Sequence, residues 1–273
     1  MPLAKNKETA SPATQYFAEV LRKLRERAGL TQDELGSRMN YTGAAVSSVE
    51  TCARPATNEF IARAEEALDA GGLIAAASKY LRLERYPAYF QGFVQLEAEA
   101  LSVSSYCPQV LEGLLQTESY ARELFRCDFP PLDEEEVEKL VEARMARKVL
   151  FDRRPVAVVH VVLEEAALRQ RIGGSTVTKE QYRYLIECAA RPNVVLQVMP
   201  LDRTGHAGLR GAMKVIETPE HTPLVYLEGQ GTSLLVSKPD EVSVLMRRHT
   251  MIRTQALGLT ESVAFIEQLA GEL

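Results

Sequence analysis

The stretch LTQDELGSRMNYTGAAVSSVE (residues 30–50) decides the fold of the N-terminal part of the chain. Thr31, with Glu34 three residues later, forms a capping-box pattern that predicts the start of a helix. Gly36 is a small residue at a position where two helices must approach closely, and Asn40 tolerates the left-handed conformation that a tight turn needs. The pattern therefore predicts two short helices that pack closely across one turn.

The second of these helices is expected to begin after Thr42, a good N-cap, with Val46 and Val49 on its buried face. Such a bihelical unit is a helix-turn-helix, whose second helix can enter a DNA major groove. Apolar residues at helical spacing also occur over residues 17–28 and 60–68. We predict a five-helix domain over residues 15–80, preceded by a flexible arm at residues 1–14.

The order of residues 30–50, followed by Arg54-Pro55, resembles the xenobiotic-response-element (XRE), or Cro/C1-like, helix-turn-helix. In that family, the Gln that opens the second helix touches phosphate and residues early in the third helix read bases. Together with basic residues of the first helix, this gives a predicted DNA-binding set: Arg22, Lys23, Arg25, Gln32, Thr42, Gly43, Ala44, Ala45, Ser47 and Ser48.

The chain departs from the family at Gly43-Ala44-Ala45, where members commonly carry Arg, Gln, Lys or Ser. Bidentate recognition of a base needs Arg, Lys, Asn or Gln, and none of these stands in residues 42–50. Two readings stay open: recognition of DNA shape with modest specificity, or a helical domain kept for protein contact.

Net charge is informative only by segment. The whole chain of 273 residues carries a formal charge of −5, from 32 Lys and Arg against 37 Asp and Glu. Residues 1–80 contain ten of each kind and are neutral, so the acidic excess belongs entirely to residues 81–273. The overall acidity therefore does not argue against DNA binding by the N-terminal part.

Residues 81–273 predict a second domain in which helices come first and strands follow. A β-branched run at residues 155–163 is typical of a buried central strand. Thr178 with Gln181 suggests a capping box that opens a helix to Ala190. The expected fold is mainly α with an α/β part: a helix-turn-helix domain, a helical collar, and a C-terminal α/β domain with a mixed sheet.

Several segments of this second part are distinctive, among them Gly113-Leu114-Leu115-Gln116-Thr117-Glu118, Arg144-Met145-Ala146-Arg147 and His206-Ala207-Gly208. They resemble the C-terminal domain of actinobacterial antitoxin-like XRE regulators of the WhiJ-like group. The resemblance implies a repressor that binds operator DNA, no catalytic residues, and control by a small BldB-like partner protein bound through residues 81–273. A homodimer is expected because such repressors bind paired half-sites.

Searches for other chemistry give weak signals. The sequence has no P-loop, GxSxG or HExxH motif, and its four His residues lack metal-ligand spacing. We therefore expect no enzyme, cofactor or metal. Two alternatives stay open: an antitoxin-like interaction protein that sequesters the small BldB-like partner, with DNA binding secondary, and a repressor that senses a small molecule. For the second, the candidate ligand residues are Tyr89, Phe90 and Phe93 of the aromatic segment 86–93, and the loop histidine His206. An aromatic core is the alternative for that segment.

Composition fits an ordinary globular chain with 46% hydrophobic residues. No apolar run is long enough to span a bilayer, and residues 1–12 lack the apolar core of a signal peptide. The four cysteines are far apart, as expected for free thiols in a reducing compartment. We expect a cytoplasmic, nucleoid-associated protein without a membrane anchor.

Overall fold

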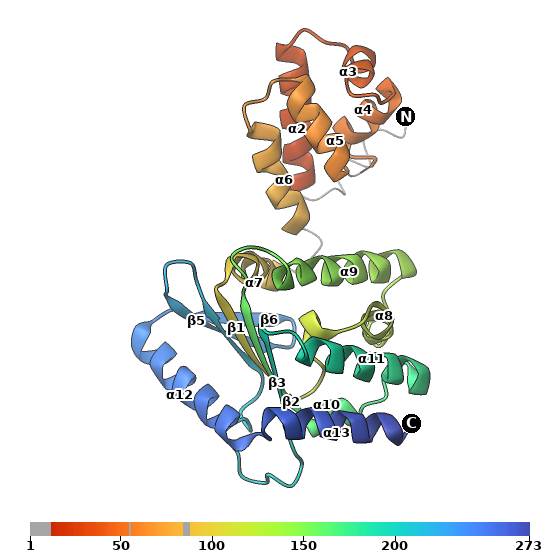
Figure 1. Cartoon of the computed structure of the whole chain (residues 1–273). Helices are drawn as coiled ribbons and strands as arrows, with labels where there is room; N and C mark the ends of the chain where they lie inside the picture. Colours follow the sequence, from red (N-terminus) through yellow and green to blue (C-terminus); the bar gives the residue numbers. More distant parts are fainter. Residues whose placement is uncertain (1–11, 55, 84–87) are drawn as a thin grey trace. The chain divides into compact units, whose positions relative to one another are not determined.

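The computed structural model describes residues 12–54, 56–83 and 88–273, and it separates the chain into two compact units, Met1–Pro87 and Ala88–Leu273 (Figure 1). The described part of the first unit is entirely helical. Its helices are α2 (Pro12–Arg27), α3 (Gln32–Arg38), α4 (Gly43–Glu50), α5 (Asn58–Ala67) and α6 (Leu73–Leu83). The expected five-helix domain is thus present, although its first helix begins at Pro12, inside the segment that we expected to be an arm.

Threonine side chains cap three helices of this unit, and two of these caps, Thr31 and Thr42, are those that the sequence indicated. The side chains of Thr31, Thr42 and Thr57 accept hydrogen bonds from the backbone three residues later, and Glu34 completes the capping box with Thr31. One face of each helix closes around a common core that includes Leu21, Leu35 and Val46. These observations confirm that capping residues and apolar spacing together set the helix boundaries.

Gly36 and Asn40 shape the turn between α3 and α4. A Cβ atom on Gly36 would lie 2.8 Å from the carbonyl carbon of Thr42 and 2.9 Å from the backbone nitrogen of Gly43. Asn40 has a φ of 55°, the left-handed conformation expected for it. The close packing of the two helices therefore depends on the absence of a side chain at residue 36.

We expect Gly36→Ala to destabilise the first unit by about 1–3 kcal/mol, because the added methyl group meets backbone atoms that cannot move aside. Thermal unfolding followed by circular dichroism measures the loss. Gly29→Ala is the matched control: no atom lies within 4 Å of its Cβ position, so it tests only the cost of a positive φ, 71° at that residue. If Gly36→Ala lowered the stability of the first unit no more than Gly29→Ala does, the close approach of α3 and α4 at residue 36 would be contradicted.

The second unit is built on a six-stranded mixed sheet in the order β3-β2-β1-β4-β5-β6. Its strands are β1 (Ser102–Cys107), β2 (Val158–Glu164), β3 (Val194–Met199), β4 (Met213–Glu217), β5 (Pro223–Gly229) and β6 (Thr232–Val236). β1, β2 and β3 run parallel to one another, whereas β4 pairs antiparallel with β1, β5 with β4, and β6 with β5. The mixed sheet and the buried β-branched strand β2 are as predicted.

Helices surround this sheet (Figure 1). In chain order they are α7 (Ala88–Glu99), α8 (Glu118–Arg126), α9 (Glu134–Ala146), α10 (Glu165–Arg169), α11 (Gly174–Ala189), α12 (Pro239–Gln255) and α13 (Leu259–Gly271), with 3-10 turns η1 (Gly113–Leu115) and η2 (Arg147–Phe151). Val242 and Ile252 of α12 join a core cluster with sheet residues such as Val225 and Val162. Among the described helices, none is both long and apolar enough to cross a membrane.

One predicted boundary in this unit is wrong. The capping box at Thr178 and Gln181 does not exist, because α11 begins at Gly174 and Thr178 lies inside it, donating its hydroxyl to the Gly174 carbonyl. Gln181 is fully buried and bridges to η1 and α8 instead. Its side-chain oxygen accepts from the Thr117 backbone nitrogen at 2.7 Å, and its nitrogen donates to the Leu115 carbonyl at 2.7 Å. A polar pair at capping spacing can thus serve long-range contacts.

Candidate nucleic-acid interface

The exposed side of α4 carries small side chains. Thr42, the N-cap, and Ala44 are exposed, while Ala45, Ser47 and Ser48 are half-buried. The Ser48 hydroxyl donates to the Ala44 carbonyl at 2.8 Å, which engages its only proton within the helix. The structure therefore brings these predicted base-reading residues together on one surface, but that surface offers methyl groups and short hydroxyls rather than long hydrogen-bonding side chains.

Gly43 has a packing role that the sequence did not reveal. It is buried, and a Cβ atom at this position would fall 1.8 Å from the Oδ1 atom of Asp33 on α3. The missing side chain makes room for this carboxylate beside the first turn of α4, where negative charge is favourable. The prediction that Gly43 contacts DNA bases is therefore wrong, because this residue is buried against α3.

Arg25 and Gln32 are also placed differently from the prediction. The Arg25 side chain is only 11% exposed, and its guanidinium pairs with the Glu50 carboxylate through Nε–Oε1 and Nη2–Oε2 distances of 2.6 and 3.0 Å. It also donates to the Leu30 carbonyl, and the Gln32 amide donates to Glu50 Oε2 at 2.8 Å. Both side chains hold α2, α3 and α4 together, so Arg25 is not an exposed phosphate ligand as predicted.

Arg22 and Lys23 do lie exposed on α2, as a phosphate contact requires. Each pairs with a carboxylate one turn away on the same helix: Arg22 with Glu26 at 2.8 Å and Lys23 with Glu19 at 3.1 Å. The pairing with Arg22 lowers the pKa of Glu26, so this carboxylate stays ionised at neutral pH. A DNA phosphate would have to compete with these two carboxylates, so Arg22 and Lys23 are weaker candidates for phosphate contacts.

Three other arginines provide exposed positive charge without such competition. Arg27, Arg38 and Arg54 are exposed, and none forms an ion pair with a residue that the structure describes. Arg38 ends α3, and Arg54 follows α4, its backbone nitrogen bonded to the Ser48 carbonyl. Sequence reasoning did not select them because charge alone does not show which cations lack a carboxylate partner.

Of the four predicted small-molecule residues, the structure describes the side chains of Phe93 and His206 alone, and these two have different neighbours. The side chains of Tyr89 and Phe90 lie outside the described residues. Phe93 is buried, with its ring centroid 4.4 Å from that of Tyr226 on β5, which supports the core reading. His206 is nearly buried elsewhere, with Nε2 3.5 Å from Glu164 Oε1, and Glu164 also accepts from the Tyr106 hydroxyl at 2.5 Å.

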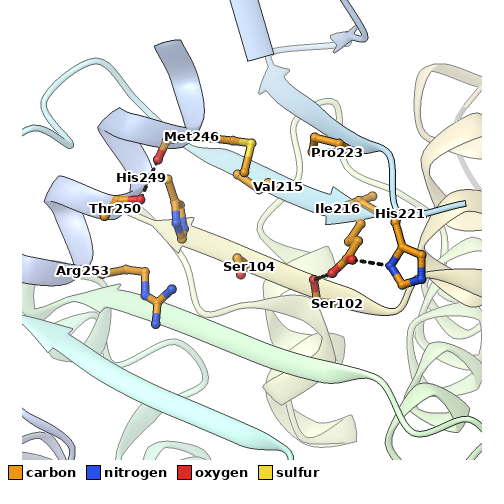
Figure 2. A pocket seen from close by; sticks show the side chains of 11 residues that line it. Ser102, Ser104, Val215, Ile216, His221, Pro223, Met246, His249, Thr250 and Arg253 are labelled. Atoms are coloured by element: carbon orange, nitrogen blue, oxygen red, sulfur yellow. Dashed lines mark hydrogen bonds and ion pairs between the residues drawn. The ribbon is translucent and has the colours of Figure 1, made fainter. Parts of the chain in front are cut away.

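A polar pocket of about 360 Å³ lies between α12 and the strands β1, β4 and β5 (Figure 2). Glu217, half-buried on β4, accepts from the Ser102 hydroxyl and pairs with His221 at 2.9 Å. His249 is buried on the opposite side, and burial lowers its pKa to about 4, so its ring is neutral at pH 7. No group of His, Cys, Asp and Glu side chains within the described ranges is arranged to hold a metal ion.

Taken with the fold, α3 and α4 define a helix-turn-helix protein that carries an α/β companion domain. Residues 17–77 match a family model described as a helix-turn-helix domain. Residues 90–268 match the model described as domain of unknown function DUF5753. The second match covers more than half of the chain, so the protein belongs to the DUF5753 family. No curated protein and no solved structure matches the chain. The helix-turn-helix domain supports a DNA-binding regulator.

Proposed function

We propose that this protein is an XRE-type transcriptional repressor that binds operator DNA as a homodimer and has no catalytic activity. The observation that carries the proposal is the helix-turn-helix at residues 17–77, with exposed Arg38 and Arg54 at the ends of its two central helices. Arginine side chains form strong hydrogen bonds with phosphate oxygens. Two-fold symmetry would place two copies of α4 one turn of DNA apart.

The test is a mobility-shift series with DNA from the protein's own promoter region. We expect affinity to fall steeply as salt rises, because each phosphate contact releases bound counterions. Arg54→Gln should weaken binding to all DNA sequences and lower the slope of log affinity against log salt by about one. Arg183→Gln is the control, since Arg183 is an exposed arginine of α11, in the second unit. Absence of a shift, or a flat salt dependence, would overturn the proposal.

The small residues of α4 add a second expectation. Thr42, Ala44 and Ala45 can sense thymine methyl groups but cannot form bidentate bonds with guanine or adenine. Unlabelled competitor DNA of random sequence should therefore reduce the shift more effectively than it does for a repressor with Arg or Gln at these positions. The mass of the free protein in solution, measured by light scattering, tests the homodimer directly.

We further propose that a small BldB-like protein controls this regulator by binding the second unit, as in an antitoxin-like pair. The observation that favours it is β6, an edge strand of the sheet, with Leu234 and Leu235 59% and 43% exposed. An exposed apolar edge strand is a template for pairing with another chain. Residues 81–273 also carry the acidic excess, which favours a basic partner surface.

Co-purification of the full chain with the product of a small neighbouring reading frame tests this control. Leu234→Arg should abolish the capture, whereas Leu209→Arg, at a leucine that is 70% exposed in a loop, should leave it intact. Equal capture of the partner by both variants would show that the partner binds a surface other than β6. No capture by the unaltered chain would reject the antitoxin-like reading while leaving DNA binding untouched.

A further inference from the structure

A cavity of about 590 Å³ opens at the carboxyl end of β1, entirely within the second unit. It lies beside the boundary between β1 and β4, where the sheet changes from parallel to antiparallel pairing. Open α/β sheets commonly bind ligands outside the carboxyl ends of their parallel strands. The position alone makes this cavity a better candidate ligand site than the aromatic segment around Phe93.

Most of the charge buried beside the cavity is internally compensated. Arg147 forms a bidentate pair with Glu97 of α7, at 2.6 and 2.8 Å, and both side chains are almost fully buried. Lys214 of β4 lies 2.9 Å from the Glu112 carboxylate. Burial alone would raise the pKa of Glu112, but Lys214 and Arg147 lower it to about 2. The two carboxylates and the two basic side chains therefore compensate one another's charge.

Arg144 is the exception. Its Nη1 atom donates to Gln116 Oε1 at 2.5 Å, and its guanidinium carbon lies 4.8 Å from the centroid of the Phe125 ring. No carboxylate of the described residues lies within ion-pair distance of it. Burial and the neighbouring charge of Arg147 lower the pKa of Arg144 to about 10, so it is still cationic at pH 7. This half-buried cation thus faces the cavity without a carboxylate in direct contact, while more distant carboxylates partly offset the effect of its burial.

The backbone is also shaped around this arginine. Gly113 of η1 lines the cavity, and a Cβ atom there would lie 2.8 Å from Arg147 Nη1 and 3.1 Å from Arg144 Cδ. A glycine at this point lets the two arginine side chains lie close against the chain. At the outer rim, Asp128 and Glu228 are exposed carboxylates that repel ligands of high negative charge.

We infer that this cavity binds a small organic molecule with a single carboxylate, which pairs with the Arg144 guanidinium. A planar carboxylate matches the fork of N–H donors on arginine and can accept two parallel hydrogen bonds. The rim acids select against multiply charged anions such as phosphate. The site goes beyond the proposed DNA binding, because it would give the second unit a small-molecule ligand of its own.

The test measures thermal unfolding of the full chain with butyrate, inorganic phosphate or chloride at equal ionic strength. A ligand that binds only the folded state raises the unfolding temperature. We expect butyrate to raise it relative to chloride at tens of millimolar, and phosphate to raise it less. Protection by neither anion, or by phosphate alone, would overturn the inference. The readout contains no DNA, so it is independent of the repressor proposal.

Two variants connect the effect to the cavity. Arg144→Gln keeps a hydrogen-bonding group but removes the charge, and it should weaken butyrate binding at least about tenfold. Val110→Glu adds a negative charge at a partly exposed position of the lining and should weaken binding without altering buried contacts. Arg183→Gln is the control that should bind as the unaltered chain does. Undiminished protection in both cavity variants would place the carboxylate elsewhere and overturn the inference.

Discussion

Replacing Glu50 by Ala is expected to cost the first unit about 3–5 kcal/mol, because it leaves the Arg25 guanidinium buried without its carboxylate. Small domains are stable by only about 5–15 kcal/mol in total. The variant should therefore lose a large share of the stability of the first unit. It should also lose DNA binding, since Glu50 joins the C-terminal end of α4 to α2 and α3 through Arg25 and Gln32.

Hydrogen exchange of the full chain distinguishes this effect from a general loss of stability, because it reports protection for each unit separately. Glu59→Ala is the matched control. Glu59 forms an exposed pair with Arg63 at 2.6 Å, and such pairs contribute about 0–1 kcal/mol. A double variant, Arg25→Met with Glu50→Leu, should recover most of the protection because no charge is left unpaired. If Glu50→Ala resembled Glu59→Ala, the buried pair would have no structural role.

The sequence predicted local features of the first unit well, for a physical reason. Caps such as Thr31 and Thr42 act on backbone groups three residues away, so their effect is visible in a short window of sequence. The pairing of Arg25 with Glu50 spans 25 residues and forms only when α2 and α4 pack together. A basic residue on a predicted helix could therefore not be assigned to DNA or to the core before the packing was known.

The same limit applies to the second unit. The β-branched run of β2 indicated a buried strand, whereas β1, with three serines, gave only a weak β signal although it lies between β2 and β4. The cavity beside Arg144 could not be predicted at all. It depends on Arg147 reaching Glu97, 50 residues away, and on Lys214 reaching Glu112, 102 residues away, which leaves Arg144 without a carboxylate.

The strongest pH dependence is expected from two buried histidines of the second unit, His160 of β2 and His249 of α12. Their ring centroids lie 5.9 Å apart, and burial, together with the nearby charge of Arg253, lowers the pKa of each to about 4. The usual pKa of histidine is about 6.5, so the unfolded chain binds more protons than the folded chain between these values. Stability present above pH 6.5 is therefore lost as the pH falls towards 4.

A pKa lowered by about 2.5 units corresponds to about 3 kcal/mol for each histidine. His249→Phe keeps an aromatic ring against His160 but removes one titrating group. We expect the free energy of unfolding of this variant to fall between pH 6.5 and pH 4 by roughly half as much as that of the unaltered chain. Denaturant titrations at a series of pH values measure this fall. His221→Asn is the control, because His221 is exposed and its φ of 58° is tolerated by Asn. Equal acid sensitivity in all three proteins would mean that carboxylates, and not this histidine pair, control unfolding in acid.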